Sequence, residues 1–511
     1  MVEVAGTEEK NSPRWRDISS VDLKNFAITC LLDIYVFLFA FGIVITNITA
    51  MQIIQDKVCI NDLNLPQEIC INIEKRPEYS KQANHLYTTA TTFRMYEDII
   101  IFVPSILITL FIGKLLDKYP QHLKIFFAAP LIGVTLHCFF VIYNVIYFEL
   151  DYRYLYLAKI PFGIFGSIAL FYSASYTYVL RYTPKKFREV RFGMIDFAFN
   201  MGLTISMAAG GSLLVSEPWF YPRLRNYMAV YSVSALACIL ALVWMALMIR
   251  NSNLQKHSSD ADDGGKEKIE NPETSEQTCI TNPTSQSRDS ENGHKFAPFN
   301  NIIQMAKTCA KKRENNGHIR LWWCLACVCL SQICLMGELT VVYQFVQKVY
   351  GWDAQYFSNL KTITNLIPTF GAITFPVILV NKMKLSDTTL GIIGSYSLLF
   401  ACLIKGGFLV PAAFYLGEVV SMFTEMMSIA FRTIAARLIS SDEYGQVFTV
   451  LSCIQASSPV TSSILYTLIF NNTLDWYPGF VYHTVACMMF MPYIVLIWMD
   501  LSERRRLAKS K

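Results

Sequence analysis

Apolar runs of about 20 residues or more, long enough to cross a bilayer as α-helices, constrain this chain more than any other feature. About twelve such runs follow one another along its 511 residues, separated by charged or turn-rich breaks. Hydrophobic residues make up 53% of the chain and charged residues only 16%, a balance that favours a membrane protein over a soluble one. The sequence therefore predicts an all-α membrane protein with about twelve transmembrane helices.

The runs fall into two groups of six on either side of a polar segment. The first group comprises residues 26–51, 88–112, 125–147, 154–180, 192–214 and 226–249, and the second 319–349, 357–380, 388–407, 408–438, 445–470 and 480–501. The intervening residues 251–318 include SSDADDGGKEKIENPETSEQ, which has too few large apolar residues to bury a core, so we expect a disordered linker. Residues 26–250 and 319–501 are thus predicted to form two six-helix bundles.

Basic residues in the short connections set the predicted orientation, because Lys and Arg concentrate in cytoplasmic loops. They are Lys114, Lys118 and Lys124 after the second run, Arg181, Lys185, Lys186, Arg188 and Arg191 after the fourth, and Lys382 and Lys384 after the eighth. We therefore expect the tails 1–25 and 502–511 and the linker to be cytoplasmic. The loop 52–87 is then extracellular or lumenal, and the Asn-Asn-Thr sequon at Asn471 lies on the same side as a candidate glycosylation site.

Two cysteines in the loop 52–87, Cys59 and Cys70, lie outside the membrane in an oxidising compartment, and we expect them to form a disulfide. The alternatives are two free thiols or a bond to another loop. The other notable group, Cys324, Cys327 and Cys329, has no matching second cluster, so we expect no metal site. No histidine lies in a convincing catalytic setting, and we expect neither an enzyme nor a bound cofactor.

Ionisable residues inside the predicted spans are the main functional signal, because a charge in lipid is costly unless it faces a cavity or a partner. Glu418, Glu425 and Arg432 follow one another at seven-residue steps in the tenth run. That spacing drifts by only about 20° per step on a helix, so the three residues are predicted to share one face. A stripe of this kind is suited to line a central cavity. The alternative is a purely structural role, in which the three residues form ion pairs with adjacent helices.

Other runs contribute single charges or a local group. The single charges are Lys159 in the fourth run, Asp196 in the fifth and Glu338 in the seventh, while Asp33 and Lys361 receive no assignment. Arg94 precedes Glu97 and Asp98 by three and four residues, a spacing that lets the arginine neutralise a carboxylate on its own helix. We interpret this trio as structural.

Carboxylates in a low-dielectric interior exchange protons near neutral pH, and basic residues in the same cavity attract an anion. The combination predicts proton-coupled symport of an organic anion by alternating access. The predicted proton-coupling residues are Asp196, Glu338 and Glu425, and the predicted substrate-binding residues are Lys159, Glu418 and Arg432. The alternative is a transport-inactive membrane receptor or scaffold of the same fold. The expected partners are the anion, protons and the bilayer, with no nucleic acid, for a monomer in the plasma membrane or, alternatively, the endolysosomal membrane.

The connection after the second run, GKLLDKYPQHLK, resembles the G-x-x-x-D-R/K-x-G-R-R/K loop of the major facilitator superfamily. Gly113, Asp117 and Lys118 match that pattern, and the resemblance implies that they form a conformational gate. Pro120 and Gln121 stand where the pattern has glycine and arginine. The resemblance also implies a fold of two six-helix bundles around a central substrate path.

Three further segments, RFGMIDFAFNMG, GELTVVYQFVQKVYGWD and FRTIAARLISSDEYGQVFTVLSCIQ, are similar to solute carrier family 46, the relatives of the proton-coupled folate transporter. The two-cysteine first loop resembles that of its insect-type members. The resemblance implies proton coupling by Asp196, a basic substrate contact at Lys159, and substrate and proton handling by Arg432. Cys334 stands near the position where the folate transporter has a histidine, and Ser167 stands where it has an aspartate. The implied substrates are folate-like compounds, muramyl peptides, cyclic dinucleotides or steroid conjugates.

Overall fold

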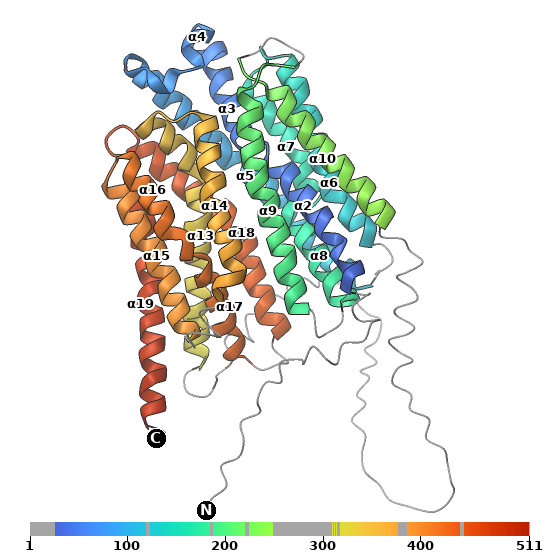
Figure 1. The fold of residues 1–511 in the computed structure, drawn as a ribbon, viewed down its shortest axis with the longest axis vertical. Helices are drawn as coiled ribbons and strands as arrows, with labels where there is room; N and C mark the ends of the chain where they lie inside the picture. The colour runs from blue at the N-terminus through green and yellow to red at the C-terminus, as the bar shows by residue number, and fades with distance from the viewer. Residues whose placement is uncertain are drawn as a thin grey trace, which may run out of the picture.

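The computed structural model describes residues 26–118, 123–183, 188–219, 224–248, 309, 311, 313, 317–376, 386–439 and 444–509. Within these ranges the chain is helical, contains no β-strand, and forms long rods that run roughly parallel (Figure 1). The first described helical turn and the end of α19 (Phe480–Lys509) lie at one end of the molecule, and α4 (Gln67–Cys70) lies at the other. We call the end that carries α4 the disulfide end.

Within the described residues, the first half of the chain builds six rods. They are formed by α2 (Leu32–Val44) with α3 (Asn47–Lys57) and η2 (Val58–Asp62), by α5 (Ser80–Lys118), by α6 (Leu123–Ile146), by α7 (Leu155–Ile164) with α8 (Ser167–Tyr182), by α9 (Arg188–Val215) and by α10 (Tyr227–Met248). Short turns η3 (Ile73–Lys75), η4 (Pro77–Tyr79) and η6 (Tyr152–Tyr154) lie in the connections. The second half builds six more, from α13 (Gly317–Tyr350), α14 (Ala354–Pro376), α15 (Asp387–Gly407), α16 (Pro411–Val420) with η10 (Ser421–Phe423) and α17 (Glu425–Arg437), α18 (Tyr444–Thr473), and α19.

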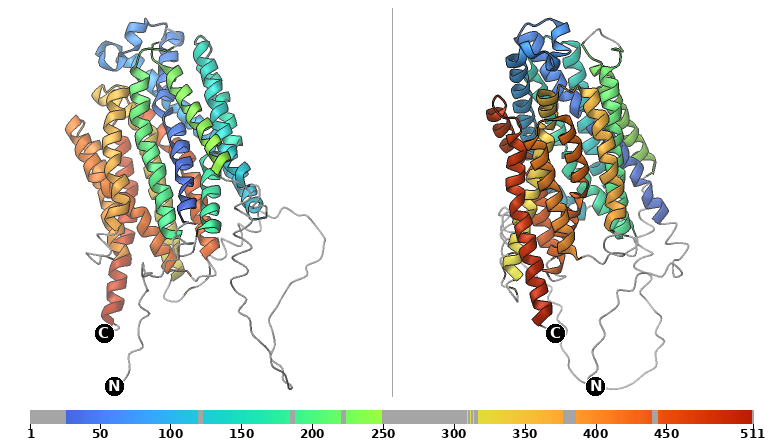
Figure 2. Two further views of the ribbon diagram at one scale, coloured as in Figure 1. Left: turned by 45° about the vertical axis from the view of Figure 1, so that its right-hand side comes forward. Right: turned by 60° about the vertical axis from the view of Figure 1, so that its left-hand side comes forward.

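Nine helical segments among the described residues are long and apolar enough to cross a membrane. The rods formed by α5, α14 and α18, which contain 39, 23 and 30 residues, are not among these nine. Together with α9, these three helices lie where the two halves meet, with α14 packed against α9 and α18 against α5 (Figure 2). Polar side chains on these faces, such as Asp98 of α5 and Ser463 of α18, are shielded from lipid by the helix opposite.

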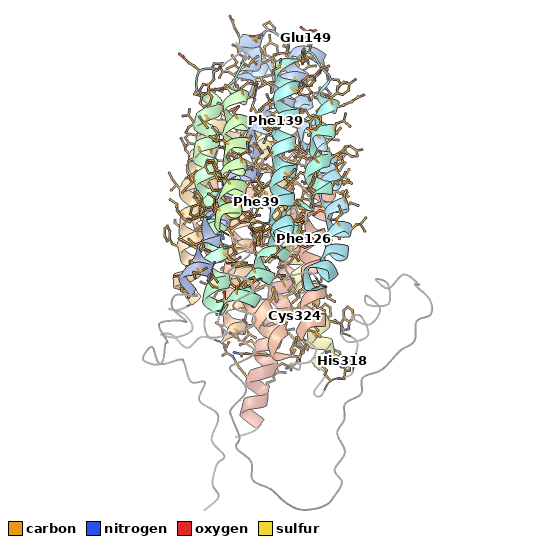
Figure 3. The ribbon with its side chains drawn as sticks, turned by 90° about the vertical axis from the view of Figure 1, so that its right-hand side faces the viewer. Phe39, Phe126, Phe139, Glu149, His318 and Cys324 are labelled. Atoms are coloured by element: carbon orange, nitrogen blue, oxygen red, sulfur yellow. A yellow bond between two sulfur atoms is a disulfide. The ribbon has the colours of Figure 1, made fainter. Side chains whose placement is uncertain are left out.

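The apolar surface supports the same arrangement. Phe139 on α6 is 55% exposed and points outward from the bundle, whereas Phe39 on α2 is fully buried between helices (Figure 3). Glu149 and His318 lie near opposite ends of the rods (Figure 3). Polar groups at the ends and exposed aromatic side chains along the rods are typical of a bundle surrounded by hydrocarbon.

Helices continue past two of the boundaries that the sequence suggests. The first rod continues to Asp62 and the second begins at Ser80, so the connection between them is far shorter than the predicted loop 52–87. The extra turns carry polar residues that bond to one another, which the apolar pattern did not reveal. At the other terminus α19 continues to Lys509, so most of the predicted tail 502–511 is helical. The linker residues 251–308 lie outside the described part of the chain.

The fourth rod is broken between α7 and α8. Gly166 has φ 86°, in the left-handed region that glycine adopts without a Cβ clash. The carbonyl oxygen of Gly166 accepts a hydrogen bond from the Ser105 hydroxyl of α5 at 2.6 Å. A side chain of a neighbouring rod therefore serves a backbone group at the break, as a helix interruption inside a membrane requires.

Candidate functional site

A buried group of four charges lies between α5 and α7, and we call it the N-terminal charge cluster. The Lys159 ammonium of α7 is 2.5 Å from a carboxylate oxygen of Glu97, whose side chain is 1% exposed. Arg94 lies 3.6 Å from Glu97 and 3.4 Å from Asp98. Two cations and two carboxylates thus neutralise one another, which is the condition under which charges persist in a low-dielectric interior.

The N-terminal charge cluster is joined to the second half of the chain through Asp98. The Ser463 hydroxyl of α18 donates a hydrogen bond of 2.6 Å to the Asp98 carboxylate. Further along the same two helices, Thr467 donates to the Thr91 carbonyl oxygen. The polar contact between α5 and α18 therefore connects a charged group in one half to the other half.

Asn471, the predicted glycosylation residue, lies in α18 and also faces α5. Its side-chain oxygen accepts a hydrogen bond from Thr91 at 2.6 Å, and its side-chain nitrogen donates to Thr92 at 3.0 Å. A glycan at Asn471 would require α5 and α18 to separate at this point.

A second buried group of four charges occupies the other half, and we call it the C-terminal charge cluster. Its members are Glu338 of α13, Lys361 of α14, Lys405 of α15 and Glu418 of α16. The Lys405 ammonium is 2.6 Å from Glu338 and 2.8 Å from Glu418, and Lys361 is 2.8 Å from the same oxygen of Glu418. The ring of Phe414 lies 5.1 Å from the Lys405 ammonium and 5.8 Å from that of Lys361. The aromatic face adds a cation–π attraction to the two lysines.

The sequence prediction missed two members of this cluster. Lys405 lies two residues before the end of α15, where a lysine is easily interpreted as a side chain that reaches toward water. In the structure that lysine is instead 1% exposed and turned inward. No carboxylate lies one turn from Lys361 on its own helix, so local spacing offers it no partner. Its partner Glu418 is on a different rod, and only helix packing brings them together.

The predicted stripe on the tenth span is interrupted. Glu418 is in α16, whereas Glu425 and Arg432 are in α17, beyond the 3-10 turn η10. A 3-10 turn has about 3 residues per turn rather than 3.6, so the seven-residue spacing no longer keeps the three residues on one face by itself. The side chains of Glu425 and Arg432 lie outside the described part of the structure, as do those of the predicted gate residues Gly113, Asp117 and Lys118 in the last turns of α5.

Asp196 and Lys159 lie toward opposite ends of the first half. Lys159 follows the start of α7 at the disulfide end and pairs with Glu97. Asp196 is near the start of α9, where the Tyr176 hydroxyl donates to its carboxylate at 3.4 Å. Nearer to the start of α9, the Arg191 guanidinium binds the Asp33 carboxylate at 2.7 and 2.9 Å.

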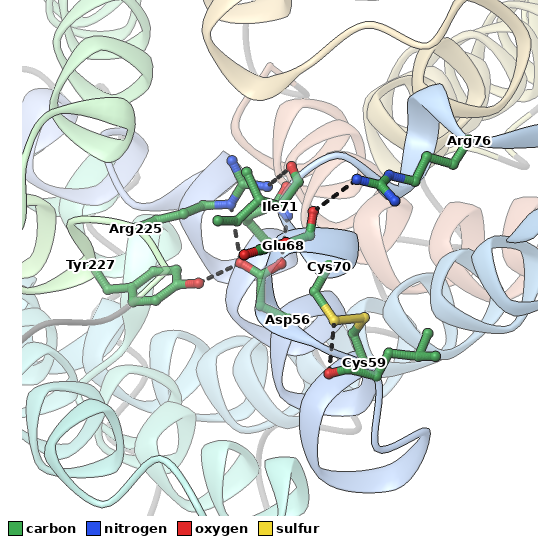
Figure 4. Close-up of a disulfide and its surroundings, with 10 residues drawn as sticks. Asp56, Cys59, Glu68, Cys70, Ile71, Arg76, Arg225 and Tyr227 are labelled. Carbon is green, nitrogen blue, oxygen red and sulfur yellow. Dashed lines mark hydrogen bonds and ion pairs between the residues drawn. A yellow bond between two sulfur atoms is a disulfide. The ribbon is translucent and has the colours of Figure 1, made fainter.

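At the disulfide end, a disulfide joins Cys59 to Cys70. Next to it, the Arg225 guanidinium contacts the Asp56 carboxylate at 3.1 Å and the Ile71 carbonyl oxygen at 2.9 Å, and Tyr227 donates to the same carboxylate (Figure 4). The disulfide-linked segment is therefore held against α3 and the start of α10.

A ladder of buried amide and hydroxyl groups then crosses from α3 to α13. Tyr343 donates to Gln52 at 2.8 Å, and Gln55 and Gln347 exchange hydrogen bonds at 2.9 and 3.2 Å. Gln52 in turn donates to Asp56 at 3.0 Å. The signal for this ladder was present in the sequence as i, i+3 and i, i+4 spacings of polar residues, which place them on one helix face.

A family model described as Major Facilitator Superfamily matches residues 87–463, well over half of the chain. This chain belongs to the major facilitator superfamily. Its two halves of six rods are the fold of that superfamily, as the sequence predicted. Solved structures of the superfamily match it along nearly their whole lengths. They include the human organic anion transporter MFSD10 (TETRAN), with TM-score 0.59, 12% identity and coverage of 92% of this chain and 99% of that one. The inward-open xylose transporter XylE from E. coli has TM-score 0.57, 14% identity and coverage of 93% and 95%.

Curated relatives of this superfamily member belong to solute carrier family 46, which confirms the resemblance found in the motifs. A Drosophila melanogaster protein named probable peptidoglycan muropeptide transporter SLC46 is 23% identical over 348 residues, which are 67% of this chain and 59% of that protein. The match thus spans less than two thirds of the Drosophila relative. A Gallus gallus protein named lysosomal proton-coupled steroid conjugate and bile acid symporter SLC46A3 is 20% identical over 481 residues, covering 92% and 93% of the two chains.

Proposed function

We propose that this superfamily member is a secondary active transporter that moves an organic anion together with protons by alternating access. The observation that carries the proposal is the pair of buried charge clusters, one in each half. Each contains two basic and two acidic side chains. Buried charges of this kind are costly and are typical of substrate and proton paths in membrane proteins.

The proposed roles are those that the sequence predicts. Asp196, Glu338 and Glu425 are proposed to carry protons, and Lys159 and Arg432 to contact the anion, with Gly113, Asp117 and Lys118 as the gate. Glu418 lies between two lysines, so its proposed part in substrate binding is to hold them in place. Proximity to an anion would be unfavourable for the carboxylate itself.

The proposed substrate class combines the cluster chemistry with the names of similar proteins. Lysine and arginine side chains recognise carboxylate, sulfate and phosphate groups through charge-assisted hydrogen bonds. The similar proteins are named for muropeptides, steroid conjugates, bile acids and organic anions. We place the disulfide end outside the cytosol, in the plasma membrane or alternatively in the endolysosomal membrane, where a lumenal acid pH would drive symport.

The test is uptake by purified protein in liposomes, with a labelled panel of folic acid, muramyl dipeptide, a cyclic dinucleotide and dehydroepiandrosterone sulfate. Uptake of at least one compound is expected to rise with an inward proton gradient and to be lost in Asp196→Asn and Lys159→Met. Lys81→Met, on an exposed lysine at the start of α5, is the control. Absence of proton-dependent uptake of every compound would overturn the proposal and favour the transport-inactive receptor of the same fold.

A further inference from the structure

The C-terminal charge cluster is a linear chain of alternating sign, Glu338–Lys405–Glu418–Lys361. Its two inner members are the most buried, with Lys405 1% and Glu418 6% exposed. Its two ends are more accessible, with Glu338 13% and Lys361 11% exposed. The chain thus has an acidic end and a basic end, and both are more accessible than its interior.

The basic end lies at the seam between the two halves. Ser358, Lys361 and Asn365 are three and four residues apart on α14, so they share one helix face. Ser358 packs against Gly211 of α9, at a position where any Cβ on residue 211 would collide with it. Asn365 donates a hydrogen bond to the Met207 sulfur of α9 at 3.4 Å. Because the residues before and after Lys361 on this face contact the first half, Lys361 is at the edge of the seam.

A second polar group on the same face of α14 has no hydrogen-bond partner among the described residues. The Ser358 hydroxyl is fully buried and makes no hydrogen bond with the described residues. It lies about one turn from Lys361 on the disulfide-end side. A lysine and an unsatisfied hydroxyl on one face at the seam are suited to a ligand that carries an oxyanion.

We propose that Lys361 binds the carboxylate, sulfate or phosphate group of the transported anion, and that protonation of Glu338 makes this binding favourable. This inference rests on the proposed function, because it assigns the coupling between protons and the transported anion to the C-terminal charge cluster. With both carboxylates ionised, the cluster is neutral and Lys361 is ion-paired with Glu418. With Glu338 protonated, the cluster carries one positive charge, and Lys361 has charge available for the anion.

The proton balance of the step is simple. Hydronium on the aqueous side transfers a proton to the Glu338 carboxylate, so that one O–H bond of hydronium breaks, one O–H bond to the carboxylate forms, and water is left behind. Lys405 then has Glu418 as its only ionised partner in the cluster. The stronger attraction between Lys405 and Glu418 weakens the ion pair between Glu418 and Lys361. When the anion leaves on the other side, the uncompensated positive charge favours release of the proton from Glu338.

Apart from the lysine and carboxylate of the cluster, the ionisable side chains beside Glu338 in the described structure are the Tyr482 phenol of α19, the Tyr466 phenol of α18 and the Cys402 thiol of α15. Cys334 lies about one turn before Glu338 on α13. Phenols and thiols have ordinary pKa values above physiological pH. Lys405 is fixed between two carboxylates, and Glu418 is fixed between two lysines. Glu338 has a single cationic partner and the greater exposure, so it is the carboxylate suited to exchange a proton.

The experiment uses full-length protein in liposomes and measures the KM and kcat of dehydroepiandrosterone sulfate and of muramyl dipeptide uptake at acidic and neutral pH. Lys361→Met is expected to raise KM by about tenfold or more, the loss of one charge-assisted contact, with kcat changed far less. Lys361→Arg is expected to recover most of the affinity because it keeps the charge. Glu338→Gln, which imitates the protonated acid, is expected to give the acidic-pH KM at both pH values and to abolish accumulation driven by a proton gradient.

Both variants leave the inner pair Lys405–Glu418 intact, so folding is expected to persist, and thermal stability measured in detergent checks this. The double variant Glu338→Gln with Lys361→Met restores a neutral cluster as a second check on folding. The Lys81→Met control should keep the wild-type KM. A wild-type KM in Lys361→Met, or a pH-dependent KM in Glu338→Gln, would overturn the inference while leaving proton-coupled uptake by the wild type in place. No uptake by the wild type would instead contradict the proposed function.

Discussion

At the residue scale, the position of a lysine within an ion-pair chain decides what its removal does. Lys405 is the only link between Glu338 and Glu418 in the described structure. Among the described carboxylates Lys361 pairs with Glu418, and Glu418 retains Lys405 when Lys361 is removed. The two lysines have similar neighbours, but removal of Lys405 leaves the buried Glu338 carboxylate without its cation, whereas removal of Lys361 leaves both carboxylates in contact with Lys405.

We therefore predict that Lys405→Met destabilises the fold by about 3–5 kcal/mol, the usual cost of breaking a buried ion pair. Lys361→Met should cost clearly less. The measurement is thermal unfolding of both variants in the same detergent. Equal losses of stability in the two variants would show that the position of a lysine in the series Glu338–Lys405–Glu418–Lys361 does not decide the cost of its removal.

Glu74 in the connection at the disulfide end gives a pH-dependent prediction outside the membrane. Burial raises the pKa of its carboxyl above the ordinary value of 4.5, with a smaller opposing effect from a backbone hydrogen bond. A raised folded-state pKa favours the protonated form, so this carboxyl contributes stability below its unfolded pKa. That contribution is lost as the pH rises through the folded-state value. Glu74→Gln is expected to be more stable than wild type at neutral pH, with the difference disappearing in acid. A pH-independent difference in unfolding temperature would contradict this assignment.

At the element scale, close helix packing at the seam depends on small side chains. Gly211 of α9 lies directly against Ser358 of α14, and a Cβ at residue 211 has no space there. The neighbouring α5 and α18 instead meet through polar side chains such as Asp98 and Ser463. One pair of helices is thus matched by shape and the other by hydrogen bonding.

Replacement of Gly211 by alanine is predicted to lower the thermal stability of the protein by forcing α9 and α14 apart. Ser358→Gly in the same protein should restore much of that stability, because it removes the atoms that the new Cβ meets. Unfolding temperatures of the two single variants and the double variant in the same detergent measure the effect. A double variant no more stable than Gly211→Ala would rule out this contact as the cause.

At the scale of the whole molecule, the halves are held together at the disulfide end by several independent contacts. Lys75 of the first connection is 3.3 Å from Asp353 between α13 and α14, and Asn84 of α5 is 2.5 Å from Asp475 beyond α18. The amide ladder between α3 and α13 lies beneath them. If the disulfide end faces outward, transport requires these contacts to separate once in every cycle.

A cross-link across this end is therefore predicted to stop transport. Cysteines introduced as Asn84→Cys and Asp475→Cys should form a disulfide under mild oxidation, and uptake should fall to background. A reducing agent should restore it, while each single-cysteine variant should respond to neither treatment. Continued uptake by a protein shown to be fully cross-linked would contradict separation of the halves at this end.

Much of the architecture follows from the sequence alone. The length and hydrophobicity of the runs determined the number of rods and their division into two halves, because a bilayer admits few other backbone arrangements. Local spacing also predicted the pairing of Arg94 with the carboxylates that follow it. These features depend on interactions within one segment or between a segment and its solvent.

Only the tertiary structure decided which distant charges meet. It paired Lys159 with Glu97 and enclosed Lys405 and Lys361 in a cluster with Glu338 and Glu418. It also interrupted the predicted stripe on the tenth span with η10. The physical reason is that an ion pair between helices depends on their order, rotation and depth in the bundle, and helical periodicity specifies a face without specifying what that face meets.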